Sequence, residues 1–166
     1  MIGLGQQHRD RCRMVIAISF LLALILDVLP LPYWAEPFRP EWVSMVLIYW
    51  CMATPQTVNV GYGWLMGLIV DLMQGSLLGQ NALAKSVIAF LAVTFHLRVR
   101  MFPLWQQSIF VVVLVLIGQA ITIWVKGLTG GLYPTWMQWM PGLSSMILWP
   151  WLFVVLRDVR RLSRAK

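Results

Sequence analysis

The chain has few of the side chains on which catalysis, metal binding and disulfide frameworks depend. Its 166 residues include six acidic residues, two histidines and two cysteines, and charged residues make up 11% of the total. No cluster of His, Cys, Asp and Glu has the spacing of metal ligands. Cys12 is expected at a membrane surface and Cys51 inside a span, so neither has an oxidised partner. We therefore expect neither a metal centre nor a disulfide scaffold.

The sequence also lacks the motifs of the common catalytic sites. It has no Gly-x-Ser-Gly nucleophile, no phosphate-binding loop and no dinucleotide fingerprint. Asp71 follows Gly67-Leu-Ile-Val, whereas intramembrane aspartyl proteases carry Gly-x-Gly-Asp. These absences predict a protein that is not an enzyme and that needs no cofactor.

Hydrophobic residues, in contrast, dominate the composition. They make up 60% of the chain, with a mean hydropathy of +0.74, and a soluble domain of this length cannot bury so much apolar surface. We predict an all-α membrane protein in which residues 1–166 form a single polytopic domain. The six predicted transmembrane helices are Met14 to Leu29, Trp42 to Thr54, Val60 to Met73, Ala82 to Leu97, Leu104 to Val125 and Gly142 to Leu156. Several are shorter than the roughly 20 residues that cross a bilayer, and a re-entrant pair at the second and third would leave both termini on the same side.

The positions of the basic residues predict the orientation. If the N-terminus is cytoplasmic, ten of the 13 basic residues lie inside, mostly in residues 1–13 and in the basic tail 157–166. This is the positive-inside bias, and it places both termini on the cytoplasmic side of the membrane. The net charge of +7 then predicts contact with anionic lipids rather than nucleic acid. A docking site for a cytoplasmic partner in the tail is the alternative.

A glycine or aspartate recurs at every fourth position in the third apolar stretch. Because residues four apart share one face of a helix, Gly63, Gly67, Asp71 and Gly75 predict a seam where a neighbouring helix packs closely. Asp71 is the exception within this seam, since an ionisable group at membrane depth is costly and suggests a function. The alternative is a packing seam in which Asp71 merely pairs with a cation.

Four polar side chains are predicted at similar depth in the outer half of the membrane. They are Asp27, Asp71, Lys85 and Gln119. Buried charges in lipid seek one another or water, so we expect Lys85 to pair with Asp71 or Asp27. The group is either a structural ion pair or a small outward-facing pocket for a polar headgroup or a partner's side chain.

The two outer loops are short, apolar and rich in aromatic residues. Aromatic side chains flanked by rigid proline make good contact anchors, although they also suit the headgroup region of a bilayer. The last apolar stretch contains Pro150, which should kink its helix. The predicted contact residues of the loops are Tyr33, Trp34, Phe38, Tyr133, Trp136 and Trp139.

The order of these motifs resembles that of the MreD family, the bacterial rod shape-determining membrane proteins. The resemblance rests on the segment Pro55 to Gly79, on Phe38-Arg-Pro-Glu-Trp42 before it, and on Leu104-Trp-Gln-Gln107 and Leu148-Trp-Pro-Trp151 after it. Asp71 matches the acidic position that follows the glycines of the family, whereas Lys85 and Asp27 do not belong to its signature. The resemblance also implies a fold similar to the six-helix substrate-binding subunits of energy-coupling-factor transporters.

The function implied by the resemblance is that of a non-catalytic scaffold in the bacterial inner membrane, within the machinery of lateral wall elongation. MreC is the implied direct partner, and the actin-like MreB and the peptidoglycan polymerase and transpeptidase are indirect partners. The alternative is a lipid- or solute-binding, transporter-like subunit that uses the outer polar pocket. A scaffold should bind its partner through the seam and the outer loops, whereas a binding subunit should hold a ligand near Asp71.

Overall fold

The computed structural model describes residues 2–130 and 136–165, and the regular structure of these residues is entirely helical. The predicted all-α class is confirmed, and each predicted span overlaps one helix. The six α-helices are α1 (Ile2–Val28), α2 (Trp42–Ala53), α3 (Val60–Gln74), α4 (Gln80–Val99), α5 (Leu104–Leu128) and α6 (Met140–Ala165). Two short 3-10 turns, η1 (Glu36–Phe38) and η2 (Trp136–Trp139), precede α2 and α6.

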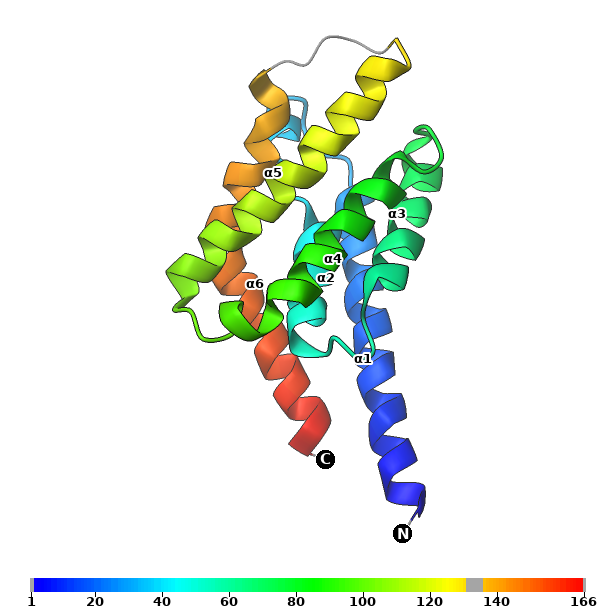
Figure 1. The fold of residues 1–166 in the computed structure, drawn as a ribbon, viewed down its shortest axis with the longest axis vertical. Coiled ribbons are helices and arrows are strands. Elements are labelled where there is room, and N and C mark those ends of the chain that lie inside the picture. The colour runs from blue at the N-terminus through cyan, green and yellow to red at the C-terminus, as the bar shows by residue number, and fades with distance from the viewer. Residues whose placement is uncertain (1, 131–135, 166) are drawn as a thin grey trace.

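The helices form one bundle with two distinct ends (Figure 1). At the terminal end lie the start of α1, the end of α6, and the α2–α3 and α4–α5 connections. At the distal end lie η1, η2 and the α3–α4 connection. Both described ends of the chain therefore lie on the same side of the bundle, as an even number of crossings requires.

The shortest α-helix, α2, occupies the centre of the bundle. All ten residues from Val43 to Met52 are buried, and α2 packs against α1, α4 and α6. Trp50 is fully buried, and its indole Nε1 donates a hydrogen bond to Ser19 Oγ on α1 over 2.8 Å. Tyr49 packs edge to face with Phe153 on α6, with ring centroids 5.6 Å apart. Helices from three parts of the chain thus enclose α2.

The outer faces of the helices are apolar. α1, for example, exposes Ile18, Leu21 and Leu22, each at least half exposed. Among the residues that the structure describes, three helical stretches are long and apolar enough to cross a membrane: Gln80–Val99, Leu104–Leu128 and Trp136–Leu162. With 12 and 15 residues, α2 and α3 are shorter than the roughly 20 residues of a full span, so the count of six crossings stays a prediction.

The last helix continues through its internal proline. α6 contains Pro150 and extends to Ala165. The predicted kink at Pro150 stays a prediction, since the continuous helix only shows that the residue is accommodated.

Candidate functional site

An open pocket of about 530 Å³ lies at the distal end of the bundle. Its walls come from the α1–α2 connection, the end of α3, the start of α4, the end of α5 and the start of α6. Three of the four predicted pocket residues, Asp27, Lys85 and Gln119, line it. The charged residues of its lining are Asp27, Glu36, Arg39, Glu41, Lys85 and Lys126. With three acids and three bases, the pocket suits a ligand or peptide segment that carries both charges.

Lys85 forms its ion pair with Glu41. Its ammonium Nζ lies 3.6 Å from Glu41 Oε2 and donates a hydrogen bond to Ser44 Oγ over 3.0 Å. Ser44 Oγ in turn donates to the Glu41 carboxylate. The predicted ion pair of Lys85 with Asp71 or Asp27 is not the one that forms. Asp71 is bound at the start of α4, Asp27 only lines the same pocket as Lys85, and Glu41, directly before α2, lies within ion-pair distance. Only 5% of the Lys85 side chain is exposed, so this pair holds α4 against α2 at the rim of the pocket.

Asp71 serves as a cap for the next helix and does not line the pocket. Its Oδ1 accepts hydrogen bonds from Ser76 Oγ and from the backbone N–H and side-chain amide of Asn81. Its Oδ2 accepts from the backbone N–H groups of Gly79 and Ala82. These are the donors left free at the start of α4, and a carboxylate there also complements the helix dipole. The prediction that places Asp71 in the outer pocket is therefore wrong.

The glycine seam lies inside the molecule, between α3 and α4. A methyl group at Gly67 would lie 2.5 Å from both Ala82 N and Asn81 O, and one at Gly63 would lie 2.6 Å from Lys85 O. The absence of these side chains lets the two backbones approach. Gly75 does not belong to this seam, because it ends α3 in the left-handed conformation at φ 61° and a methyl group there would meet nothing within 4 Å. The seam face is occupied by α4, so it is not free for a partner.

Two further residues of the pocket were missed from the sequence. Arg39 donates hydrogen bonds from Nη1 to Asp27 O (2.6 Å) and from Nη2 to Leu29 O (2.7 Å), and so holds the α1–α2 connection over the end of α1. Glu41 was missed because it lies just outside the predicted second span and was assigned to the outer loop. The signal that could have identified it is its position at the outer end of that span, the depth predicted for Lys85. Gln119 was predicted, and its buried Oε1 has no hydrogen-bond partner among the described residues.

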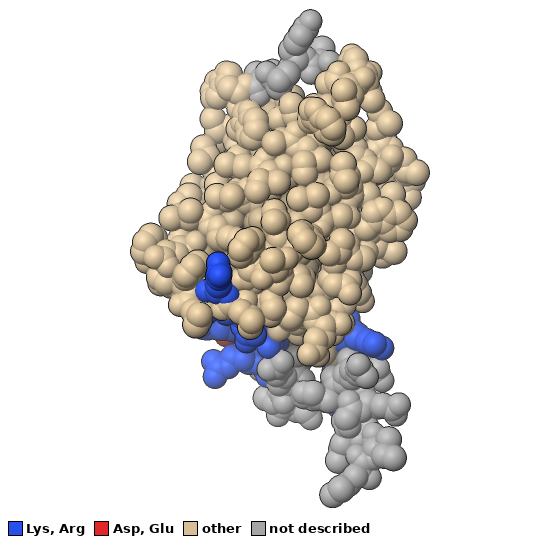
Figure 2. Space-filling view, viewed as in Figure 1, with Lys and Arg blue, Asp and Glu red and all other residues tan. Residues whose placement is uncertain are grey.

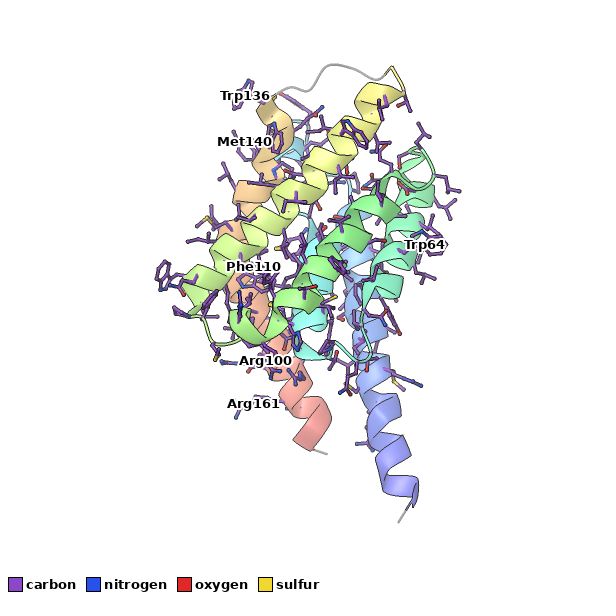
Figure 3. The ribbon with its side chains drawn as sticks, in the orientation of Figure 1. Trp64, Arg100, Phe110, Trp136, Met140 and Arg161 are labelled. Carbon is purple, nitrogen blue, oxygen red and sulfur yellow. The ribbon has the colours of Figure 1, made fainter. Side chains whose placement is uncertain are left out.

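Aromatic side chains crowd the outer surface of the same end. Five of the six predicted contact residues are described, whereas Tyr133 lies outside the described residues. Because η1 contacts α6, the two loops that carry them are neighbours, and Figure 3 shows Trp136 projecting from the distal tip. We call these five residues the distal aromatic surface: Tyr33 (88% exposed), Trp34 (69%), Phe38 (57%), Trp136 (67%) and Trp139 (40%).

The terminal end of the bundle is rich in basic residues. In Figure 2, lysine and arginine side chains gather there on the visible face, and the rest of that face lacks their colour. The basic residues of this end with described side chains are Arg11, Arg13, Arg98, Arg100, Arg157, Arg160 and Arg161. The molecule is thus polarised, with a basic end and an aromatic end.

Within residues 2–130 and 136–165, no group of three or more His, Cys, Asp or Glu residues could hold a metal ion. What the distal end offers is a mixed-charge pocket beside an aromatic surface, which is suited to recognition.

Comparisons with known proteins identify the family of the chain. Residues 8–159 match the family described as rod shape-determining protein MreD. A curated relative, the rod shape-determining protein MreD of Haemophilus influenzae, is 34% identical over 142 residues, which cover 86% of this chain and 88% of the relative. No solved structure matches, so the likeness to energy-coupling-factor subunits stays a prediction.

Proposed function

Because the chain belongs to the MreD family of rod shape-determining proteins, we propose that it is a non-catalytic scaffold of the cell-wall elongation machinery. Family membership and the apolar helices establish a membrane protein with a role in cell shape. The scaffold binds MreC directly and, through it, helps to organise MreB and the peptidoglycan polymerase and transpeptidase during lateral wall synthesis. The observation that carries this proposal is the distal aromatic surface.

The proposed orientation places this surface outside the cytoplasm. The basic terminal end supports a cytoplasmic location for both termini under the positive-inside rule, with anionic lipids around it. The bundle then crosses the inner membrane, and the distal end faces the periplasm, where the bulk of MreC lies.

The distal aromatic surface has the properties of a protein contact. Large aromatic side chains supply most of the binding energy in many interfaces, because they bury much apolar area with few rotatable bonds. Tyr33 is 88% exposed and lies between Pro32 and Trp34 in a connection that Arg39 holds in place. Because these hydrogen bonds restrain the backbone of the connection, less of its conformational entropy is lost on binding.

The proposal is tested by removing part of the surface without touching the bundle. In cells that depend on this chain, the triple variant Tyr33→Ala, Trp34→Ala, Phe38→Ala should reach normal membrane levels, lose MreC on co-purification and produce rounded cells. The matched control is Trp105→Ala, which removes a 62% exposed tryptophan at the terminal end and should keep both MreC and rod shape. Full MreC recovery with the triple variant would contradict the proposal.

The second candidate function is a lipid- or solute-binding subunit that uses the distal pocket. It is favoured by one observation: Gln119 lines the pocket, and its buried Oε1 has no hydrogen-bond partner among the described residues. Mass spectrometry of molecules that co-purify with the wild type and with Gln119→Leu distinguishes the two. A stoichiometric small molecule present only in the wild type would favour a binding subunit.

A further inference from the structure

A second, smaller pocket opens at the terminal end of the bundle. It has a volume of about 160 Å³, and its walls come from the end of α2, the α4–α5 connection, the start of α5 and the last part of α6. Figure 3 shows Arg100 at this end, and Arg157 and Arg160 of α6 share the pocket with it. We call these three residues the arginine pocket. The remaining lining residues are Tyr49, Met52, Ala53, Gln107 and Phe153.

The arginine pocket carries a strong positive charge. None of the lining residues that the structure describes is acidic, and guanidinium groups stay protonated at any physiological pH. Arg157 has a carboxylate nearby, with its Nε 3.8 Å from Asp158 Oδ1, but both side chains are at least half exposed and solvent screens such a pair. Arg100 and Arg157 thus bring two positive charges to one cavity, and these charges favour an anion inside it.

The pocket is held in shape by the chain around it. The Nε2 of Gln107 donates hydrogen bonds to Val99 O and Phe102 O, both over 3.1 Å, and so fixes the connection that carries Arg100. Gln107 is only 5% exposed, and its Oε1 has no hydrogen-bond partner among the described residues. A ligand with a hydroxyl group near its anionic centre would satisfy this acceptor.

The surroundings of the pocket identify the source of the anion. Met52, Ala53 and Phe153 form apolar walls, and in α6 the apolar run ends at Leu156 and the basic tail starts at Arg157. This change of polarity is where the headgroups of a bilayer lie. Phosphate oxygens accept paired hydrogen bonds from arginine, and basic pockets between membrane helices suit anionic lipid headgroups.

We propose that the arginine pocket binds the phosphate of one anionic phospholipid whose headgroup carries a hydroxyl, with the start of its acyl chains against the apolar walls. The site is independent of the scaffold role, since it lies at the other end of the molecule from the distal aromatic surface.

The test uses the full chain in detergent and measures lipid binding by native mass spectrometry. Phosphatidylglycerol should bind once per chain and at least about tenfold more tightly than zwitterionic phosphatidylethanolamine. Both lipids offer a phosphate to the arginines, but the ammonium group of ethanolamine is repelled by the guanidinium groups, whereas glycerol supplies the hydroxyl. The double variant Arg100→Gln, Arg157→Gln should remove this preference. The control Arg98→Gln, Arg161→Gln makes the same charge change at the same end, outside the pocket lining, and should keep it.

Three outcomes would overturn the proposal. Equal binding of the two lipids by the wild type would exclude a selective site. This measurement uses the wild type alone, so it holds even if a variant fails to fold. Equal loss in both double variants would show general attraction to basic charge. Stabilisation of the wild type by inorganic phosphate as large as that by phosphatidylglycerol, read as a shift in melting temperature, would show a site for free anions. None of these results bears on the scaffold proposal, which is tested separately by the loss of rod shape in the distal triple variant.

Discussion

Replacing Gly67 with alanine should destabilise the bundle by opening the contact between α3 and α4. The added methyl carbon would lie 2.5 Å from Ala82 N and Asn81 O, and closer still to Ala82 Cα, whereas ordinary contact begins at 3.4 Å. The backbones must therefore separate by more than about 0.9 Å. The atoms that it meets belong to the backbone, which cannot rotate away. The same separation would stretch the hydrogen bonds that the backbone N–H groups of Asn81 and Ala82 donate to the Asp71 carboxylate.

The magnitude follows from two opposing terms. Overpacking of this kind typically costs 1–3 kcal/mol, and alanine regains up to about 1 kcal/mol of helix propensity over glycine. Because the backbone contact and the cap are both affected, we expect an overpacking cost of about 3 kcal/mol. After the gain in helix propensity, the free energy of unfolding should fall by about 2 kcal/mol.

Other glycines of the same chain supply a graded control. A methyl group at Gly118 would meet only the flexible end of Ile88, and one at Gly127 in α5 would meet nothing within 4 Å. Unfolding in mixed micelles, followed by helix content, should therefore rank the alanine variants with Gly67 least stable, Gly118 intermediate and Gly127 at or above the wild type. Equal stability of the Gly67 and Gly127 variants would refute the close packing of α3 on α4.

Three further predictions follow from the polar contacts and the charge distribution. Asp71→Asn should lower the free energy of unfolding by about 2–3 kcal/mol, since it replaces one acceptor oxygen with an NH2 group that faces other donors. Adding Lys85→Met should lower the free energy of unfolding further, and a recovery of stability in the double variant would instead indicate that Asp71 and Lys85 pair. Glu41→Gln and Lys85→Met should instead be non-additive by about 1 kcal/mol or more in a double-mutant cycle, and additivity would argue against their ion pair. In a cysteine-free background, an impermeant maleimide should label Thr129→Cys and spare Ser163→Cys in intact cells, whereas the reverse pattern would invert the proposed orientation.

The sequence was sufficient for the helices because their signal is local. Runs of apolar residues, interrupted by Pro32 or by Gly75 and Gly79, locate all six helices, and the predicted bounds of α2 to α5 lie within a few residues of the observed ones. The start of α1 at Ile2 and the end of α6 at Ala165 were not predicted, because both helices continue beyond the apolar run into polar and basic sequence. Depth along a helix also follows from the sequence, which is why Asp27, Lys85 and Gln119 were correctly grouped at one end.

The partners of the charged residues could not be predicted in the same way. Depth does not specify which helices are neighbours or which way a side chain points around the axis. Lys85 could have met any acid at its depth, and the packing of α4 on α2 selects Glu41. Asp71 was assigned to the pocket because the tight turn through Gly75 and Gly79, which brings the start of α4 over its carboxylate, was not anticipated.

The arginine pocket is a further case of this limit. Arg100 and Arg157 lie far apart in the sequence and belong to separate basic groups. The positive-inside rule accounts for each group by itself, so neither group indicates a binding site. Only the fold brings them to one cavity.

The enclosure of α2 has a consequence for how the protein is made. As the second helix to leave the ribosome, α2 has only 12 residues, about 18 Å of helix, and its cover includes α4 and α6, which are synthesised later. A nascent chain that stops after α3 therefore presents a short segment whose packing partners do not yet exist. Stable insertion of α2 must await the C-terminal half of the chain, so truncation anywhere before α6 should expose the centre of the molecule to membrane quality control.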